Sequence, residues 1–143
     1  MVPADTTPVL LAQLLSQVER RVARRVERVL DADGVNLEQW RVLSLLADGR
    51  GHPMSEIAGY AMVPAPTLTK IIDRMVERNL VYRRLDDADR RRVLVFLARR
   101  GRDLYRTLIA KVQREEQAIL QQVGESDRTQ FQQLLTRMLD HIP

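Results

Sequence analysis

Three consecutive arginines, Arg90, Arg91 and Arg92, follow an acidic run that begins at Asp86. Exposed guanidinium groups at the tip of a hairpin suit a narrow DNA minor groove, where the negative potential is enhanced. An acid beside phosphate is repulsive, so we expect Asp89 to pair with a neighbouring arginine and fix its direction, a surface contact worth about 0 to 1 kcal/mol. A polar hairpin turn without further function is the alternative interpretation.

A second set of candidate contact residues begins at Pro64, where a helix is expected to start. Threonine can hydrogen-bond bases or phosphates, lysine can contact phosphate or guanine, and alanine can contact a thymine methyl group. The candidates in this segment are Pro64, Ala65, Pro66, Thr67, Thr69, Lys70 and Arg74. The residues expected to face the core are Ile71, Ile72, Met75 and Val76. The alternative is that the threonines at the start of this helix only cap it and do not contact DNA.

The segments around these residues predict three helices. Asn36 and Gln39 form a capping-box pattern that predicts a helix over 37–47, which Gly49 and Gly51 end. A short helix is expected over 54–60. The next runs from Pro64 to about residue 79, with prolines in its first turn, where their missing N–H groups cost nothing.

A change of period follows these helices. The β-branched and apolar runs 80–85 and 92–97 bracket the charged tip and predict a two-stranded ribbon, which Gly101 is expected to end. Two helices in succession followed by a ribbon indicate a helix-turn-helix with a wing. The second helix of such a pair lies in the DNA major groove.

Long amphipathic helices are expected at both ends of the chain, over about 11–29, 104–123 and 126–142. Their apolar stripes exceed what the small central module can cover, so we predict a two-fold homodimer built from them. The residues assigned to dimerisation are Leu11, Leu15, Val18, Leu134, Leu135 and Met138. Packing within one chain is the alternative. Glu115 interrupts the stripe of the second of these helices.

Length and composition fit one folded domain. The chain has 143 residues, of which 45% are hydrophobic and 29% charged. It has no cysteine and two histidines, which argues against disulfides, thiolate chemistry and most metal sites. Gly49 and Gly51 lack the third glycine of a dinucleotide motif, and His52 near Ser55 is not a triad. We therefore expect no enzyme activity, no cofactor and no metal.

The charge distribution indicates a polyanionic partner. Residues 37–101 carry twelve basic and eight acidic side chains, which account for the whole net charge of +4, whereas both flanks are formally neutral. This favours double-stranded DNA as the partner of the central segment. A solvated surface, or a winged helix that serves as a protein-interaction module without specific DNA binding, is the alternative.

No membrane partner is expected, and a cytoplasmic location is the default. The longest apolar run, 93–98, is far shorter than the roughly 20 residues that span a bilayer. The segment Met1 to Pro8 lacks the basic start and apolar run of a signal peptide.

The wing carries the most specific resemblance to a known family. A pattern met by Asp89, Arg91, Val95, Leu97 and Gly101 is similar to the wing of the multiple-antibiotic-resistance regulator (MarR) family of winged-helix transcription factors. Residue 98 is alanine where the family usually has threonine, which affects the cap of the next helix. Segments 37–43, 67–75 and 79–84 resemble the family's second helix, recognition helix and start of the wing.

The resemblance implies a mainly α fold with a small β-ribbon and three functional parts. Residues 1–36 would be an N-terminal dimerisation helix, 37–101 a winged helix-turn-helix DNA-binding domain, and 102–143 the C-terminal dimerisation helices. It also implies a homodimer on a palindromic operator, with half-sites about 10 bp apart, usually acting as a repressor.

Site roles and an effector follow from the same resemblance. Asp89 would orient the wing, while Arg91, together with Arg90, reaches the minor groove. A small aromatic or lipophilic effector would release the DNA. Trp40 could line the effector pocket, but a lone tryptophan on a helix is more often part of the core, and we predict that role.

Overall fold

The computed structural model describes residues 10–143. Residues 1–8, in which no signal peptide is expected, lie outside the described residues. The described chain is mainly α-helical with a small antiparallel sheet, as predicted. Its elements are α1 (Leu11–Asp31), α2 (Leu37–Leu46), β1 (His52–Pro53), α3 (Met54–Ala61), α4 (Ala65–Glu77), β2 (Val81–Leu85), β3 (Val93–Leu97), α5 (Arg99–Gln121) and α6 (Glu125–His141). None of these helices is long and apolar enough to cross a membrane.

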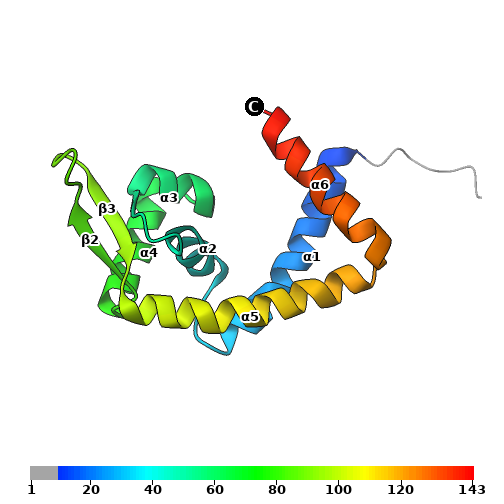
Figure 1. Cartoon of the computed structure of the whole chain (residues 1–143), viewed down its shortest axis with the longest axis horizontal. Helices are drawn as coiled ribbons and strands as arrows, with labels where there is room; N and C mark the ends of the chain where they lie inside the picture. The colour runs from blue at the N-terminus through cyan, green and yellow to red at the C-terminus, as the bar shows by residue number, and fades with distance from the viewer. Residues whose placement is uncertain (1–9) are drawn as a thin grey trace, which may run out of the picture.

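Helix α5 runs along the whole molecule and joins its two ends (Figure 1). Helices α2, α3 and α4 and the β2–β3 ribbon lie at one end, and α6 and the start of α1 lie at the other. The second half of α1 packs on α5 through the buried Val26 and Leu30. Glu115, which interrupts the apolar stripe of α5, accepts a hydrogen bond from Arg25 of α1 at 2.5 Å. The interruption is therefore a polar link between the two helices.

The start of α2 forms as its sequence predicts. The side chain of Asn36 accepts a hydrogen bond from the backbone N–H of Gln39 at 2.8 Å, and the Gln39 side chain accepts one from the Asn36 N–H at 3.1 Å. This reciprocal capping box satisfies two donors that the first turn would otherwise leave unpaired. Trp40 is 8% exposed and stacks on Tyr105 of α5, with ring centroids 5.5 Å apart. The prediction that Trp40 belongs to the core is confirmed.

The sheet has one strand more than the predicted ribbon. Its order is β1-β3-β2, all antiparallel, with both His52 and Arg83 opposite Val95. Strand β1 is two residues long and ends in Pro53, which lacks a backbone N–H and is tolerated at a sheet edge. No periodicity can be seen in two residues, so the strand was not predicted.

The prediction that Gly101 ends the ribbon is wrong. Gly101 is buried inside α5, and a Cβ built on it would lie 2.0 Å from the carbonyl oxygen of Leu80. Glycine is needed here for a close backbone approach, and the ribbon ends at Leu97 instead. Helix α4 also begins one residue later than predicted, because Pro64 is its N-cap.

Candidate nucleic-acid interface

Helix α4 is divided sharply into a core face and a solvent face. Ile72 and Met75 are fully buried, as predicted, and Leu68, which was not among the expected core residues, is buried with them. The expected core residues Ile71 and Val76 are half-buried. Every contact candidate on this helix or at its N-cap is exposed, namely Pro64, Ala65, Pro66, Thr67, Thr69, Lys70 and Arg74. The Thr69 hydroxyl donates to the carbonyl of Ala65 at 3.1 Å, so its oxygen remains free to accept.

The wing tip, residues 86–92, is organised by backbone hydrogen bonds. The Asp86 N–H donates to the carbonyl of Arg92 and the Arg92 N–H to that of Asp89, both at 2.9 Å. The carboxylate of Asp89 accepts from the backbone N–H of Arg91 at 3.1 Å. This differs from the expectation, because Asp89 holds the backbone of its neighbouring arginine rather than the guanidinium. Asp89, Arg90 and Arg91 are all exposed.

An aromatic stack supports the outer face of the wing. Tyr82 of β2 stacks on Phe96 of β3, with ring centroids 5.5 Å apart, and the Arg84 guanidinium lies 4.6 Å above the Phe96 ring. Gly51 (φ +73°) lies against the same ring, and a Cβ there would come within 2.3 Å of it. The loop before β1 is therefore shaped to receive Phe96.

One sequence feature that the predictions missed connects the wing to α4. Arg83 of β2 donates to the carboxylate of Asp73 of α4 at 2.5 Å. The two residues are ten positions apart and lie on different elements, so periodicity does not reveal the pair. The alternation of β2 was the available signal, because it places Arg83 on the same face as the buried Val81.

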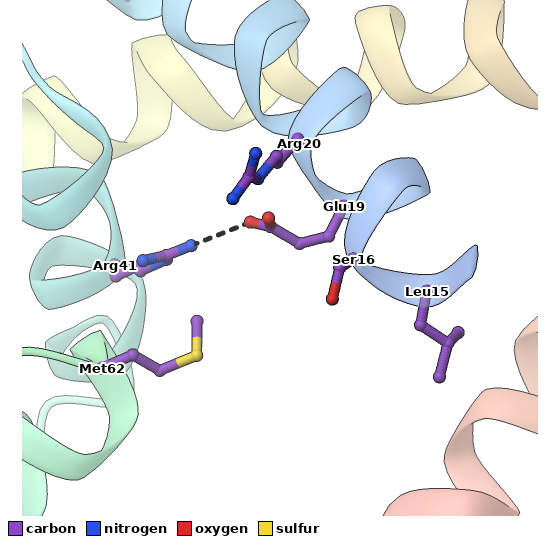
Figure 2. A pocket seen from close by; sticks show the side chains of 6 residues that line it. All are labelled: Leu15, Ser16, Glu19, Arg20, Arg41 and Met62. Atoms are coloured by element: carbon purple, nitrogen blue, oxygen red, sulfur yellow. Dashed lines mark ion pairs between the residues drawn. The ribbon is translucent and has the colours of Figure 1, made fainter. Parts of the chain in front are cut away.

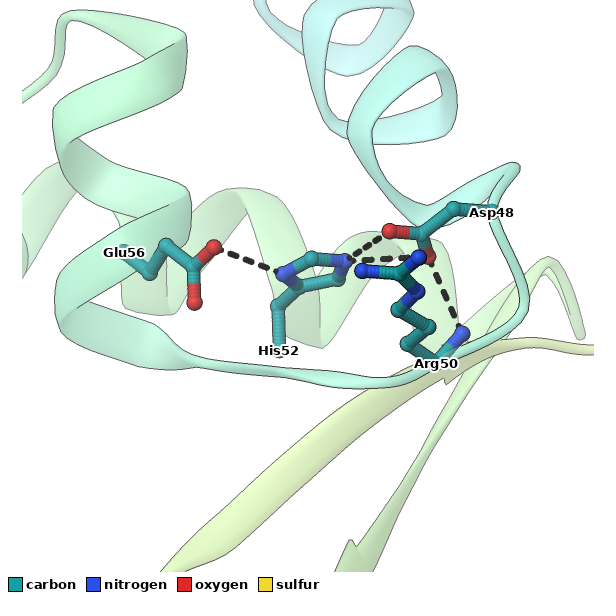
Figure 3. Close-up of polar contacts among 4 residues, drawn as sticks. All are labelled: Asp48, Arg50, His52 and Glu56. Carbon is teal, nitrogen blue, oxygen red and sulfur yellow. Dashed lines mark hydrogen bonds and ion pairs between the residues drawn. The ribbon is translucent and has the colours of Figure 1, made fainter.

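His52 is held between two carboxylates at the junction of α2, β1 and α3 (Figure 3). Its Nε2 contacts Asp48 at 2.8 Å and its Nδ1 contacts Glu56 at 2.9 Å. Both ring nitrogens are thus engaged, which leaves neither to activate Ser55. Burial acts to raise the pKa of Asp48, but the hydrogen bond from the Arg50 backbone and the hydrogen bond and charge of His52 outweigh it, so this pKa lies below its usual value.

A pocket of about 500 Å³ lies between α1 and the helix-turn-helix (Figure 2). Its lining residues are Leu15, Ser16, Glu19, Arg20, Arg41 and Met62. The guanidinium of Arg41 lies 3.6 Å from the Glu19 carboxylate, and its other terminal nitrogen donates to the carbonyl of Ala61 at 3.3 Å. Arg41 therefore contacts both α1 and the end of α3, next to the left-handed residue Met62 (φ 57°).

The residues assigned to dimerisation lie on α1 and α6. Leu11, Leu15 and Val18 occupy the first half of α1 and are 59%, 36% and 43% exposed. On α6, Leu134 is 50% exposed, while Leu135 and Met138 are half-buried. Packing within the chain leaves this apolar surface largely open.

Comparison with known proteins assigns this arrangement to a family. Residues 35–93 match the profile of the MarR family. The HTH-type transcriptional regulator YwoH of Bacillus subtilis (strain 168) is 30% identical over 129 residues, which cover 90% of this chain and 93% of YwoH. The chain belongs to the MarR family. The relatives it matches are transcriptional regulators, and this chain is a transcriptional regulator.

Solved structures share the fold of this MarR-family regulator. NadR, in complex with 4-hydroxyphenylacetate, superposes with a TM-score of 0.81 at 26% identity, over 99% of both chains. The transcriptional repressor CouR, bound to a 23-mer DNA duplex, superposes with a TM-score of 0.80 at 24% identity, over 91% of this chain and 92% of CouR. The winged helix-turn-helix predicted from the sequence is confirmed.

Proposed function

We propose that this MarR-family regulator is a homodimeric repressor that binds a palindromic DNA operator. Residues 37–101 form the DNA-binding domain, in which α4 enters the major groove and the wing tip enters the adjacent minor groove. Arg90 and Arg91 supply the minor-groove contacts, and Asp89 holds the tip in the shape that presents them. The DNA duplex bound to CouR supports this mode of binding.

One observation carries the proposal. All the residues assigned to DNA on α4 and the wing tip are exposed, while the apolar residues between them on α4 are buried or half-buried. Exposed hydroxyl, ammonium and guanidinium groups on a rigid helix and hairpin match the donors that bind phosphates and base edges. The same segment holds the entire net charge of the chain.

Selection of bound duplexes from a random pool tests the function directly. We expect an enriched palindrome with half-site centres about 10 bp apart, and an affinity that falls steeply with salt because phosphate contacts release counterions. A pool without enrichment would contradict operator binding. Binding that does not respond to salt would favour a winged-helix module for protein partners.

Residues 1–36 and 102–143 supply the dimer interface in this proposal. The open apolar surface of α1 and α6 is typical of an interface, and α6 has no buried residue in the isolated chain. Both segments are formally neutral, so two copies approach without net repulsion. The occupant of this surface is therefore a second copy of the chain.

Light scattering after size-exclusion chromatography is expected to give the mass of a dimer at micromolar concentration. Leu134→Glu should shift the mass towards the monomer, because a carboxylate would be buried without a partner. Ser55→Glu places the same charge at an exposed position of α3, outside both segments, and serves as the control. A monomer mass for the unmodified protein would refute the dimer.

The pocket beside Arg41 is the proposed site of a small aromatic carboxylate effector. Arg20 and Arg41 supply positive charge there, and Leu15 and Met62 supply apolar walls. The 4-hydroxyphenylacetate held by NadR belongs to this chemical class. An anion that binds Arg41 competes with Glu19 and disturbs the contact with Ala61, which links the pocket to the turn before α4.

Titration with 4-hydroxyphenylacetate, followed by the fluorescence of Trp40, is expected to give a saturable change at or below millimolar concentration. Arg41→Ala should weaken this binding about tenfold, since it removes a charge-assisted hydrogen bond. Arg24→Ala removes the same charge from an exposed position of α1 outside the pocket and should leave binding unchanged. The absence of a saturable signal would contradict an effector of this class.

A further inference from the structure

Asp73 is an acid on the helix assigned to the major groove. It is exposed and follows Lys70 by three residues, so it lies on the side of α4 that carries contact candidates. A carboxylate near DNA phosphate is repulsive and lowers affinity for every duplex. Its presence at this place therefore requires a compensating role.

The partner of Asp73 indicates that role. Arg83 of β2 donates to the Asp73 carboxylate, and the two side chains are 54% (Asp73) and 35% (Arg83) exposed. Exposed ion pairs contribute little to the stability of a fold. The pair does, however, connect the two elements that are proposed to bind separate grooves of the same duplex.

The pair lies where the ribbon leaves the body of the domain. Val81 and Val95 are buried on the inner face of the ribbon, but Leu85 and Val93, further along the same face, are 48% and 39% exposed. Arg83 lies between Val81 and Leu85 on β2 and opposite Val95 on β3, where the buried part of this face ends. The wing tip is roughly 15 Å further along the strand, so a small tilt at Arg83 becomes a larger displacement at the tip.

We propose that Asp73 and Arg83 form a positioning pair that fixes the wing relative to α4. This inference rests on the proposed DNA-binding function. A wing held in place loses less conformational freedom when it enters the minor groove, which strengthens binding only where both grooves fit. The negative charge of Asp73 meanwhile weakens binding to unrelated duplexes. The pair therefore raises the specificity ratio rather than the affinity for DNA in general.

Asp73→Asn tests the proposal because the charge effect and the positioning effect have opposite signs. We expect the affinity for the selected operator to fall about tenfold, while the affinity for an unrelated duplex of equal length stays the same or rises. Glu77→Gln is the matched control, since it removes one negative charge from the next turn of α4. It should not weaken operator binding. Thermal melting of both variants verifies that they fold.

A double-mutant cycle separates the pair from a direct phosphate contact of Arg83. If Arg83 acts through Asp73, the variant with both Asp73→Asn and Arg83→Gln should bind the operator about as weakly as Arg83→Gln alone. Additive losses, or an unchanged specificity ratio in Asp73→Asn, would overturn the proposal.

A measurement without DNA keeps this test separate from the proposed function. The chain has no cysteine, so Ala88→Cys at the wing tip and Thr107→Cys on α5 give one labelled pair per chain, and an excess of unlabelled chains keeps labelled pairs in separate dimers. Electron paramagnetic resonance should show a distance distribution between them that is broader in Asp73→Asn and unchanged in Glu77→Gln. An unchanged distribution in Asp73→Asn refutes positioning. If the protein prefers no duplex but the distance distribution is broader in Asp73→Asn, only the operator function is refuted.

Discussion

Gly101→Ala is expected to lower the free energy of unfolding by about 3 kcal/mol. The added Cβ would lie 2.0 Å from the Leu80 carbonyl oxygen and 3.2 Å from a methyl group of Leu97. That oxygen accepts a hydrogen bond from the Ala98 N–H at 2.9 Å, and the Leu80 N–H donates to Met75 at the same distance. The backbone therefore cannot move away without loss of the contacts that join α4, the wing and α5.

Urea denaturation of the variant and of Gly59→Ala measures this effect. Gly59 lies within α3 and has nothing within 4 Å of its Cβ position, so alanine there should stabilise the protein by up to about 1 kcal/mol through helix propensity. The same propensity gain acts at residue 101 but is outweighed by the clash. Equal stabilities for the two variants would contradict the close approach of α5 to Leu80.

Gly101 also shows where sequence patterns stop being informative. A glycine after a β-branched run is typical of the end of a strand, and nothing local distinguishes that role from a close contact with a carbonyl of residue 80. The capping box at Asn36 was predictable because both partners lie three residues apart and act through the local backbone. Strand β1 was not, because its pairing with Val95 depends on the tertiary fold.

The candidate site divides in the same way. The exposure of the α4 candidates followed from helical periodicity, since Ile72 and Met75 were expected on the buried side, although the burial of Leu68 was not predicted. The position of Asp89 in the wing was predicted, but its hydrogen-bond partner was not, because a carboxylate can bond either the backbone or a guanidinium two residues on. The Asp73–Arg83 pair and the pocket beside Arg41 join separate elements, and no spacing in the sequence encodes them.

Arg91→Ala is expected to weaken operator binding by about 1 to 3 kcal/mol and to leave the free energy of unfolding nearly unchanged. The side chain is exposed, so its removal creates no cavity. The tip keeps its hydrogen bonds, because residue 91 takes part in them through its backbone N–H and not through its side chain. Titration of a labelled operator at fixed salt measures the loss. Arg114→Ala removes the same charge from an exposed position of α5 and should cost much less.

Asp89→Ala separates minor-groove insertion by Arg91 from general attraction to DNA. Asp87→Ala removes an acid from the same tip and should tighten operator binding through its charge. If the wing contributes only charge, Asp89→Ala should tighten operator binding in the same way. If Arg91 has to be presented at one angle, Asp89→Ala should weaken binding, because the turn loses the hydrogen bond to the Arg91 N–H. We expect opposite signs for the two aspartate variants. Tighter binding in both, or unaltered affinity in Arg91→Ala, would show that the wing does not insert into the groove.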